Sequence, residues 1–521
     1  MMTSQAVQTT VSLARNTNQA LGIGEFAVDF MNGSIGEPDE AVRNRTLQFF
    51  TDSVICGISA IALNTNAPRV LREEALCYES ANGVGIFGST KRVSPEKAIV
   101  ANCSAVREWD SNGTNFGFNP KLGHTAGEFG HNDFYPVPIA AAQIANKDGN
   151  FALRGMILLD EIRGRLAEVF SLKSYRIDHV VHGAIASAAT YGAMLGATPQ
   201  QIESAIGMMV AHYIPFRAIR AGKQLSDSKG ASAAISTEAA ILSMQRSMRG
   251  FVGPKDIFRN PEAIWRQFEP TEGDSPFDLV LSHSGDDFAV MGMHFKLGLY
   301  EHQSAGALQG LLDLIEQNPQ LLDSPNAISS MKVIAYEPAF GIIGDPAKRD
   351  PQTRQSADHS MVYIIATALR KALELAKKTG STTLADTNDG YWKKLILTPN
   401  DFHENAIFDE TTRAIMQTIT FEHGGQEYDA KYPDGIPTSL IITDKDGKEY
   451  DSGLVMYPSG HARNNTANLD DLLSNKWQTL GSLATDNPNT IIDKFNSLEQ
   501  QSASDLASLY DFEITAREGY E

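Results

Sequence analysis

The segment that organises the sequence reads Cys103-Ser-Ala-Val-Arg-Glu-Trp-Asp-Ser-Asn-Gly-Thr114 and ends, after a glycine-rich run, in Glu128-Phe-Gly-His131. A helical pattern beginning at Ser94-Pro95 runs into it, and Asn112-Gly113 is a strong signal for the end of that helix. Asp110 is therefore expected on the last helical turn, with Thr114 and His131 in an irregular segment beyond it. Such segments often carry chemistry when helices position them, but the residue types alone fit a helix-capping surface loop equally well.

The length and charge of the chain restrict its class. A chain of 521 residues is too long for one core, so two or more domains are expected. Hydrophobic residues make up 42% and charged residues 21%, as in ordinary globular proteins. The net charge of −19 argues against a nucleic-acid partner and against an anionic membrane surface. No apolar run is long enough to span a bilayer.

The cysteines and histidines do not indicate a metal site. Cys56, Cys77 and Cys103 lack metal-ligand spacing and fit buried thiols in a reducing compartment. The histidines lack the H-E-x-x-H pattern, and no cysteine set suits an iron–sulfur cluster. We therefore expect neither a metal nor a cofactor. Residues 1–24 contain Arg15 and no acid, so we expect a flexible tail and a cytoplasmic protein, with the mitochondrial matrix as the alternative.

Hydrophobic periodicity predicts a mainly α-helical protein. Helical patterns cover Glu25 to about Ile61, with a helix start at Pro38-Asp39-Glu40, and most of the alanine-rich region from Pro136 to about Met248. The hydrophobic pattern is no longer purely helical beyond about residue 290. There, residues 329–336 have the pattern of a strand and residues 439–450 that of a hairpin with an Asp-Gly turn. The chain becomes helical again after Pro458. This order indicates a helical part, an α+β part and a helical end.

Residues 83–88 match the pattern G-x-G-x-x-G. A dinucleotide-binding fingerprint needs a strand before it and a helix that opens inside it. The preceding residues 78–82 are not strand-like, and the next helix begins only at Ser94-Pro95. We interpret the segment as a glycine-rich turn or short hairpin, and keep NAD binding as a minor alternative.

Seven short motifs follow one another along the chain: Trp109-Asp110-x-Asn112-x-Thr114, Glu128-Phe-Gly-His131, Asp178-His179-Val180, Asp227-Ser228-Lys229, Phe295-Lys296 with His302, Asp358-His359-x-x-x-Tyr363, and Tyr457-Pro458-x-Gly460-His461. Together they resemble the MmgE/PrpD family, whose members include 2-methylcitrate dehydratase, cis-aconitate decarboxylase and iminodisuccinate epimerase. Each motif is weak alone, but their shared order identifies the family far better than it identifies a substrate.

The resemblance implies a mainly α fold in which both ends of the chain build one large helical domain and a smaller α+β lid domain is inserted. The expected boundaries are a tail at 1–24, helical residues 25–290, a lid at 291–457, and helical residues 458–521. A homodimer with an active site in the cleft between domains is also implied. A cleft between domains is a normal place for a small-molecule site.

The implied activity is that of a hydro-lyase acting on a small carboxylic acid. Such an enzyme eliminates water from a hydroxy tricarboxylic acid after a base removes a proton beside a carboxylate, and histidine suits that role. Lysine or arginine would hold the other carboxylates. Two alternatives remain open: a decarboxylase or epimerase acting on a related acid, and a non-catalytic or dinucleotide-binding protein.

The resemblance implies Asp110, His131 and His179 as catalytic residues. We expect His131 to exchange the substrate proton with a pKa of roughly 6–7, and Asp110 to orient its ring or raise its basicity. His179 is the alternative base, at the exposed start of a helix. For both histidines, a hydrogen-bonded structural role is the competing interpretation.

Four further residues are expected to bind substrate. Thr114 would donate a hydrogen bond to a carboxylate, Lys229 would act from a helix N-terminus, Lys296 would add positive charge from the lid side, and Tyr363 would donate from the lid. By residue type alone they would be a turn residue, two surface lysines and a core tyrosine.

Three departures from the family pattern leave the substrate open. Gly113 stands where the dehydratases commonly carry aspartate, about seven additional residues precede Glu128, and the segment from Lys296 to His302 is short. All three lie near the expected substrate pocket, so specificity for methylcitrate does not follow from the resemblance.

Overall fold

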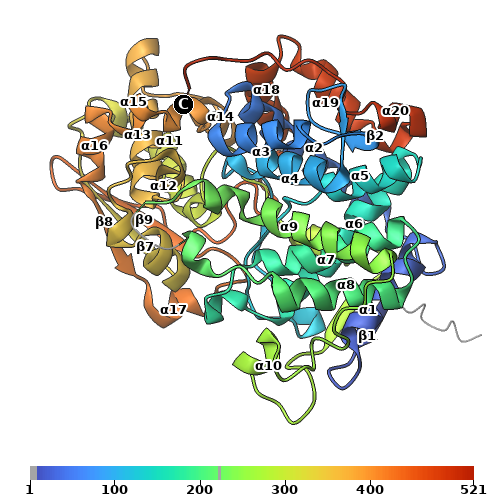
Figure 1. Ribbon diagram of the computed structural model, residues 1–521. Helices are drawn as coiled ribbons and strands as arrows, with labels where there is room; N and C mark the ends of the chain where they lie inside the picture. Colours follow the sequence, from blue (N-terminus) through green and yellow to red (C-terminus); the bar gives the residue numbers. More distant parts are fainter. Residues whose placement is uncertain (1–8, 221–223, 521) are drawn as a thin grey trace, which may run out of the picture.

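The computed structural model describes residues 9–220 and 224–520 and is mainly helical, as predicted (Figure 1). Residues 1–8 of the predicted tail lie outside the described part. The rest of that prediction is wrong, because Thr10–Leu13 forms strand β1, which pairs antiparallel with β6 (Leu279–Ser282), and helix α1 begins at Gln19. Asn18 caps α1 with its side chain, so the chain is structured well before residue 24.

The α-helices are α1 (Gln19–Met31), α2 (Glu40–Ala62), α3 (Asn66–Leu76), α4 (Pro95–Glu108), α5 (Pro136–Ile144), α6 (Gly149–Val169), α7 (Val180–Met194), α8 (Pro199–His212), α9 (Asp227–Met248), α10 (Ile264–Phe268), α11 (Ala305–Gln317), α12 (Arg354–Ala357), α13 (Met361–Thr379), α14 (Asn388–Leu395), α15 (Glu404–Ile407), α16 (Glu410–Met416), α17 (Gly425–Asp429), α18 (Leu469–Ala484), α19 (Pro488–Asn496) and α20 (Ala503–Ala507). The remaining strands are β2 (Glu79–Gly85), β3 (Arg92–Val93), β4 (Thr114–Asn115), β5 (Gly130–His131), β7 (Ile328–Ala335), β8 (Ile419–His423), β9 (Thr438–Asp444) and β10 (Glu449–Asp451).

Helix α7 lies at the centre of the helical part, packed against α6, α8 and α9 (Figure 1). Nearly all of its residues are buried, and many of them are Ala, Gly or Ser, which lets neighbouring helices approach closely. Helix α9 also packs against α4, and α4 packs against α2. The first turns of α7 and α9 and the end of α4 therefore belong to one packed unit, which lies next to the cavity described below.

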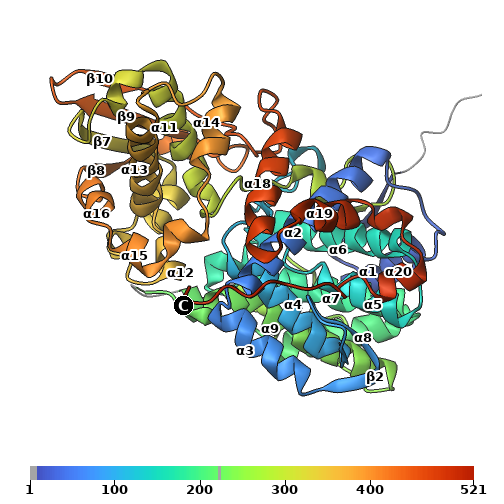
Figure 2. The same ribbon diagram turned by 90° about the horizontal axis from the view of Figure 1, so that it is seen from above.

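The C-terminal helices return to the helical part (Figure 2). Helices α18 and α19 pack on α2, and α20 packs on α5. The contact between α18 and α2 contains a buried ion pair, in which the Lys476 ammonium lies 2.7 Å from the Asp52 carboxylate. Lys476 also donates to the Ser111 carbonyl at 2.7 Å, and the Trp477 indole donates to Asp52 at 2.9 Å. Residues more than 400 positions apart thus share one core.

The α+β part contains a four-stranded sheet in the order β10-β9-β7-β8, with β7 antiparallel to β9 and parallel to β8. This confirms the strand predicted near 329–336 and the hairpin at 439–450. Helix α11 packs on β9, and α13 packs on α11 and α16. In Figure 2 this part lies beside the helical part, with α18 close to the boundary between them.

Residues 83–88 lie in the short hairpin that was predicted, but its first strand already begins at Glu79, within the segment that was expected not to be strand-like. Strands β2 and β3 pair antiparallel to form this hairpin. A Cβ atom at Gly83 would lie 2.4 Å from the Val93 carbonyl oxygen, so glycine is needed there for close packing of the two strands. Its role in this fold is structural, and the alternative of dinucleotide binding receives no support.

Within the described residues, no single helix has both the length and the apolar character required to cross a bilayer. Helices α2 and α3 reach that threshold only when taken together, across a bend of 89°.

Replacing Lys476 by Met should destabilise the helical part, because it leaves the Asp52 carboxylate buried without its counter-charge. Loss of one partner of a buried pair typically costs about 3–5 kcal/mol, and urea unfolding followed by tryptophan fluorescence would measure the change. The deficit should shrink as the pH falls, since burial already raises the pKa of Asp52 and an unpaired carboxyl takes up a proton more readily still.

Lys393→Met is the matched control, because Lys393 pairs with Asp471 at 2.6 Å on an exposed surface of α18. Its cost should stay under about 1 kcal/mol. Equal losses in the two variants would contradict the importance assigned to the Asp52–Lys476 pair.

Candidate active site

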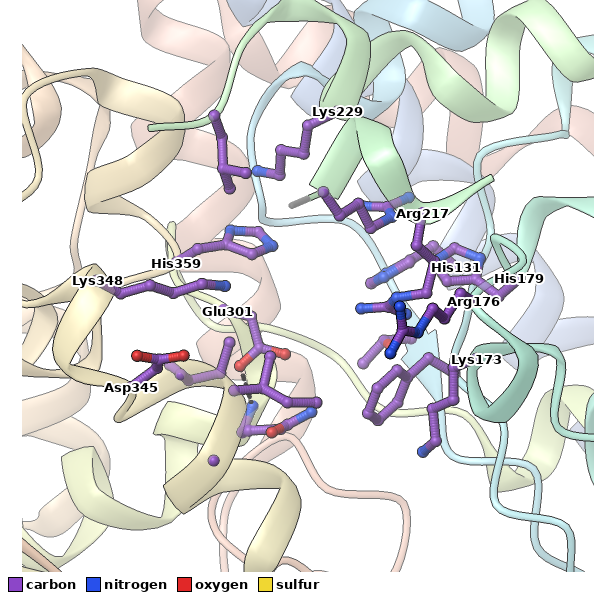
Figure 3. A pocket seen from close by; sticks show the side chains of 18 of the residues that line it. His131, Lys173, Arg176, His179, Arg217, Lys229, Glu301, Asp345, Lys348 and His359 are labelled. Carbon is purple, nitrogen blue, oxygen red and sulfur yellow. Dashed lines mark hydrogen bonds between the residues drawn. The ribbon is translucent and has the colours of Figure 1, made fainter. Parts of the chain in front are cut away.

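A cavity of about 770 Å³ lies between the helical and the α+β parts (Figure 3). The helical part lines it with residues from the segments 114–131, 173–179 and 216–229. The α+β part contributes residues from 301–303 and 341–348, together with His359. Both parts thus supply side chains to one cavity, which is the arrangement expected of a small-molecule site.

Asp110 lies beneath this cavity, fully buried. Helix α4 ends at Glu108 and Trp109 is extended, so Asp110 lies just beyond the helix rather than on its last turn as predicted. Its carboxylate pairs with Arg107 at 3.2 Å and hydrogen-bonds to the Lys296 ammonium. Lys229 lies 3.7 Å away. Burial alone would raise the pKa of Asp110, but the surrounding cations hold it well below its ordinary value.

His359 connects Asp110 to a second buried carboxylate. Its Nε2 lies 3.1 Å from Asp110, and its Nδ1 lies 2.7 Å from Asp358. Lys229, in the first turn of α9, pairs with Asp358 at 3.0 Å. Burial, reinforced by Lys229, lowers the pKa of His359 to about 3 despite the two carboxylates. The carboxylates, the histidine and the lysine therefore form one fixed network.

Asp110, Asp358 and His359 place their ligand atoms within 4.8 Å of one another, a spacing that a metal ion could bridge. The donor set does not fit that role well. Lys296 and Lys229 already contact the oxygens that a metal would need, and a divalent cation beside these ammonium groups would be repelled. The fixed cations supply the charge that a metal would bring.

His131 and His179 lie together on the helical wall of the cavity, with ring centroids 5.2 Å apart (Figure 3). Strand pairing of β4 with β5 places Thr114 opposite His131. His131 was expected to contact Asp110, but the group beside it is Arg107, whose Nη2 lies 3.5 Å from its Nε2. Burial and the Arg107 charge lower the pKa of His131 well below its ordinary value. It is therefore neutral at neutral pH, as a base must be, but it does not have the predicted pKa of 6–7.

His179 occupies the N-cap position of α7 and is buried, not at the exposed helix start that was predicted. The preceding Asp178 pairs with Arg220, which fixes the start of the helix. Burial lowers the pKa of His179 well below its ordinary value. Both histidines on this wall are therefore uncharged imidazoles.

The other predicted residues lie in three different places relative to the cavity. Thr114 and Lys229 line the cavity. Lys296 is completely buried against Asp110, so it contributes to the floor and not to the lining. Tyr363 lies outside the cavity, because its hydroxyl donates to the Asp401 carbonyl at 2.5 Å and its ring packs near Phe402. Tyr363 is therefore not placed to contact a substrate in the cavity, contrary to the prediction.

The sequence interpretation missed four cations of the cavity: Lys173, Arg176, Arg217 and Lys348. No carboxylate among the described residues lies within 4.0 Å of their charged atoms. Glu128 instead accepts hydrogen bonds from main-chain N–H groups, including that of Lys173 at 2.6 Å, and so fixes this turn. The sequence signal was present as short cationic runs around 173–176 and 217–220 in a strongly acidic chain.

Glu301 and Lys348 stand on the α+β wall, across the cavity from the histidines (Figure 3). The main-chain N–H of Glu301 donates to the Asp358 carbonyl at 2.9 Å, and its carboxylate accepts from the main-chain N–H of Gln303 at 2.8 Å. Burial, followed by the nearby Asp110 charge, raises the pKa of Glu301 to about 7. Burial lowers the pKa of Lys348 to about 8. Sequence reasoning did not single out either residue.

Fold and site together define a mainly helical protein whose cavity, between its helical and α+β parts, can hold an anion between neutral histidines and a protonatable carboxyl. Residues 25–275 match the model of the MmgE/PrpD N-terminal domain. This segment of the chain is an MmgE/PrpD N-terminal domain by similarity.

Curated relatives share 22–25% identity with this chain. The 2-methylcitrate dehydratase of Escherichia coli O157:H7 is 22% identical over 73% of this chain and 74% of its own length. The mitochondrial 2-methylcitrate dehydratase of Yarrowia lipolytica is 25% identical over 59% and 55%. A probable 2-methylcitrate dehydratase of Saccharomyces cerevisiae is 23% identical over 82% and 80%. This level of identity supports a dehydratase-like function without fixing the substrate.

Arg217→Gln should weaken the binding of a non-reactive tricarboxylate such as tricarballylate by roughly 10- to 100-fold, the range expected for losing one charge-assisted hydrogen bond. Calorimetric titration would measure this, and binding by the wild type should weaken with added salt. Arg246→Gln, a change at the far end of α9, is the control. Unchanged affinity in Arg217→Gln would remove this residue from the anion site.

Proposed function

We propose that this protein is a hydro-lyase that eliminates water from a small hydroxy tricarboxylic acid. The observation that carries the proposal is the pairing of two neutral histidines with a protonatable Glu301 across a cavity rich in unpaired cations. The names of the relatives support the same class of reaction. Elimination needs a base, an acid and fixed positive charge, and the cavity offers all three.

In the proposed first step, His131 takes the proton from the carbon beside a substrate carboxylate. The carbanion is delocalised into that carboxylate, which becomes doubly negative in the transition state. Arg217, Arg176 and Lys229 would stabilise this charge and hold the remaining carboxylates. Substrate binding also brings negative charge close to Arg107 and His131, which raises the pKa of His131 toward the working pH. The free enzyme thus holds a weak base that becomes stronger in the complex.

In the proposed second step, the carbon–oxygen bond breaks and Glu301 protonates the departing hydroxide. Water leaves, the carbon–carbon double bond forms, Glu301 is left as a carboxylate and His131 as an imidazolium. Lys348 stands near Glu301 (Figure 3) and stabilises the carboxylate that results. Exchange of one proton with solvent at each residue then restores the starting state.

We further propose that the α+β part, residues 291–457, acts as the lid, because it carries Glu301 and Lys348 toward the histidines. Closure would exclude water and strengthen every charge interaction in the cavity. The segment Ala339–Ile343 forms a π-helix on the cavity wall, a local irregularity that is frequent at functional sites.

A decarboxylase or epimerase would use the same cationic clamp and differ from a hydro-lyase in the bonds that break. An epimerase returns the proton to the same carbon, and a decarboxylase releases carbon dioxide. Neither reaction needs an acid for a departing hydroxide, so Glu301 favours elimination.

The product distribution tests the proposal. Incubation with 2-methylcitrate, citrate and cis-aconitate, with the products identified by NMR, should show loss of water from a hydroxy acid, and His131→Gln should lower kcat by about 10²- to 10⁴-fold. His179→Gln should retain more activity. Carbon dioxide release from cis-aconitate without any dehydration would replace the proposed activity by the decarboxylase alternative.

The pH dependence tests the two assigned roles. Because the pKa of His131 is depressed in the free enzyme, the acidic limb of kcat/KM should lie below the ordinary histidine value of about 6.5, and that of kcat should lie higher. Because Glu301 must be protonated, kcat/KM should fall as the pH rises through about 7. Glu301→Gln should lower kcat strongly and abolish this basic limb.

Asp345→Asn is the matched control for Glu301→Gln, because Asp345 also lines the cavity but caps a short helix by accepting a hydrogen bond from the main-chain N–H of Ala347 at 2.7 Å. The kcat/KM profile of the Asp345→Asn enzyme should keep its basic limb near pH 7. A Glu301→Gln enzyme that kept both its rate and its basic limb would rule out Glu301 as the acid.

A further inference from the structure

We propose that the substrate of this cavity is a polycarboxylic acid that also carries an apolar substituent larger than a methyl group, such as an alkyl chain. The inference rests on the proposed function for the carboxylate end of the ligand and adds the chemistry of the other end. Two observations carry it: the size of the cavity, and the apolar side chains that line it on both walls.

The cavity is larger than a citrate-type acid requires. Its volume is about 770 Å³, within the range of roughly 300–1,000 Å³ that holds ligands of drug size. A citrate-type acid displaces roughly six waters, or about 180 Å³ at about 30 Å³ per water in the liquid, so it would leave most of this space to solvent. A pocket shaped for a small acid alone would surround it closely, because orientation depends on close contact.

Apolar side chains line the cavity on both walls, beside the cations. Phe116, Phe129 and Phe216 line it from the helical part, and Ile342, Ile343 and Ala347 line it from the α+β part. The Phe116 and Phe129 rings pack edge to face at 5.6 Å, and the Lys173 ammonium stands 3.9 Å from the Phe129 ring centroid. An anion-binding group thus lies directly against an apolar surface.

Phe216 marks the outer end of this surface. It is 62% exposed although it lines the cavity, and it adjoins Arg217 in the chain. A ligand with its carboxylates on Arg217 would place a substituent within reach of Phe216 and cover it. Large aromatic side chains left open to water beside a binding site commonly mark a surface that a ligand covers.

Each methylene that enters this apolar region should tighten binding by roughly fourfold, which corresponds to about 0.8 kcal/mol per buried CH₂. The carboxylates would still set the orientation through the cations. An apolar tail would therefore raise affinity and select among acids that share the same reacting centre.

Calorimetric titration with succinate and with butyl- and hexylsuccinate tests the proposal without depending on turnover, because these acids have no hydroxyl group to eliminate. Affinity should rise by roughly fourfold per methylene, and Arg217→Gln should weaken every member of the series alike. An affinity independent of chain length would overturn the inference. A chain-length gain in acids whose binding is unaffected by Arg217→Gln would also overturn it, since detergent-like adsorption does not need the carboxylate site.

Phe216→Ser and Ile342→Ser should each reduce the ratio of hexylsuccinate to succinate affinity severalfold. Phe408→Ser is the matched control, since Phe408 is also an exposed phenylalanine, at 46%, and does not line this cavity. An equal reduction in the control would assign the effect to nonspecific adsorption and overturn the inference.

Turnover of a parallel series of 2-alkylcitrates separates the two proposals. Dehydration of 2-methylcitrate with no preference for longer chains would retain the proposed function and overturn the inference. A chain-length gain in succinate binding with no dehydration of any alkylcitrate would overturn the proposed function while retaining the apolar region as a binding surface.

Discussion

The buried carboxylate of Asp110 is the constraint on which the site depends. Its counter-charges come from three places: Arg107 at the end of α4, Lys229 at the start of α9, and Lys296 where the chain enters the α+β part. A buried charge that loses its partners is strongly destabilising, so these elements must keep their relative positions. Asp110 thereby fixes the floor of the cavity and links the helical part to the α+β part.

This arrangement also determines which cations can serve a ligand. Lys296 is committed to Asp110, and Lys229 is shared with Asp358. Among the described cations that line the cavity, Lys173, Arg176, Arg217 and Lys348 have no carboxylate within 4.0 Å. The same floor depresses the pKa of His131 through Arg107. The ion pairs of Asp110 beneath the cavity therefore influence the basicity of His131 inside it.

Much of the fold follows from local patterns, whereas the partners within the site do not. Helix starts, the glycine hairpin and the β9–β10 hairpin were predictable because caps, turns and periodicity act over a few residues. The sequence motifs led to Thr114, His131, His179 and Lys229 at the cavity. They gave Asp110 the wrong partner, because its contacts with His359 and Lys296 span about 190 to 250 positions and depend on packing. Glu301 and Lys348 carried no motif, and their pKa values are unusual because of burial and of charges that only packing brings near them.

The pair between Asp52 on α2 and Lys476 on α18 has a consequence for the order of events during protein synthesis. The ribosome completes α2 long before Lys476 emerges. The Asp52 carboxylate therefore stays hydrated and unpaired for most of translation. Desolvating it earlier would bury an unpaired charge. The helical part can therefore reach its final packing only after the whole α+β part has been made, and its apolar helices remain exposed meanwhile. Chains of this kind have long-lived partly folded states, and we expect this one to depend on chaperones in proportion to the length of that delay.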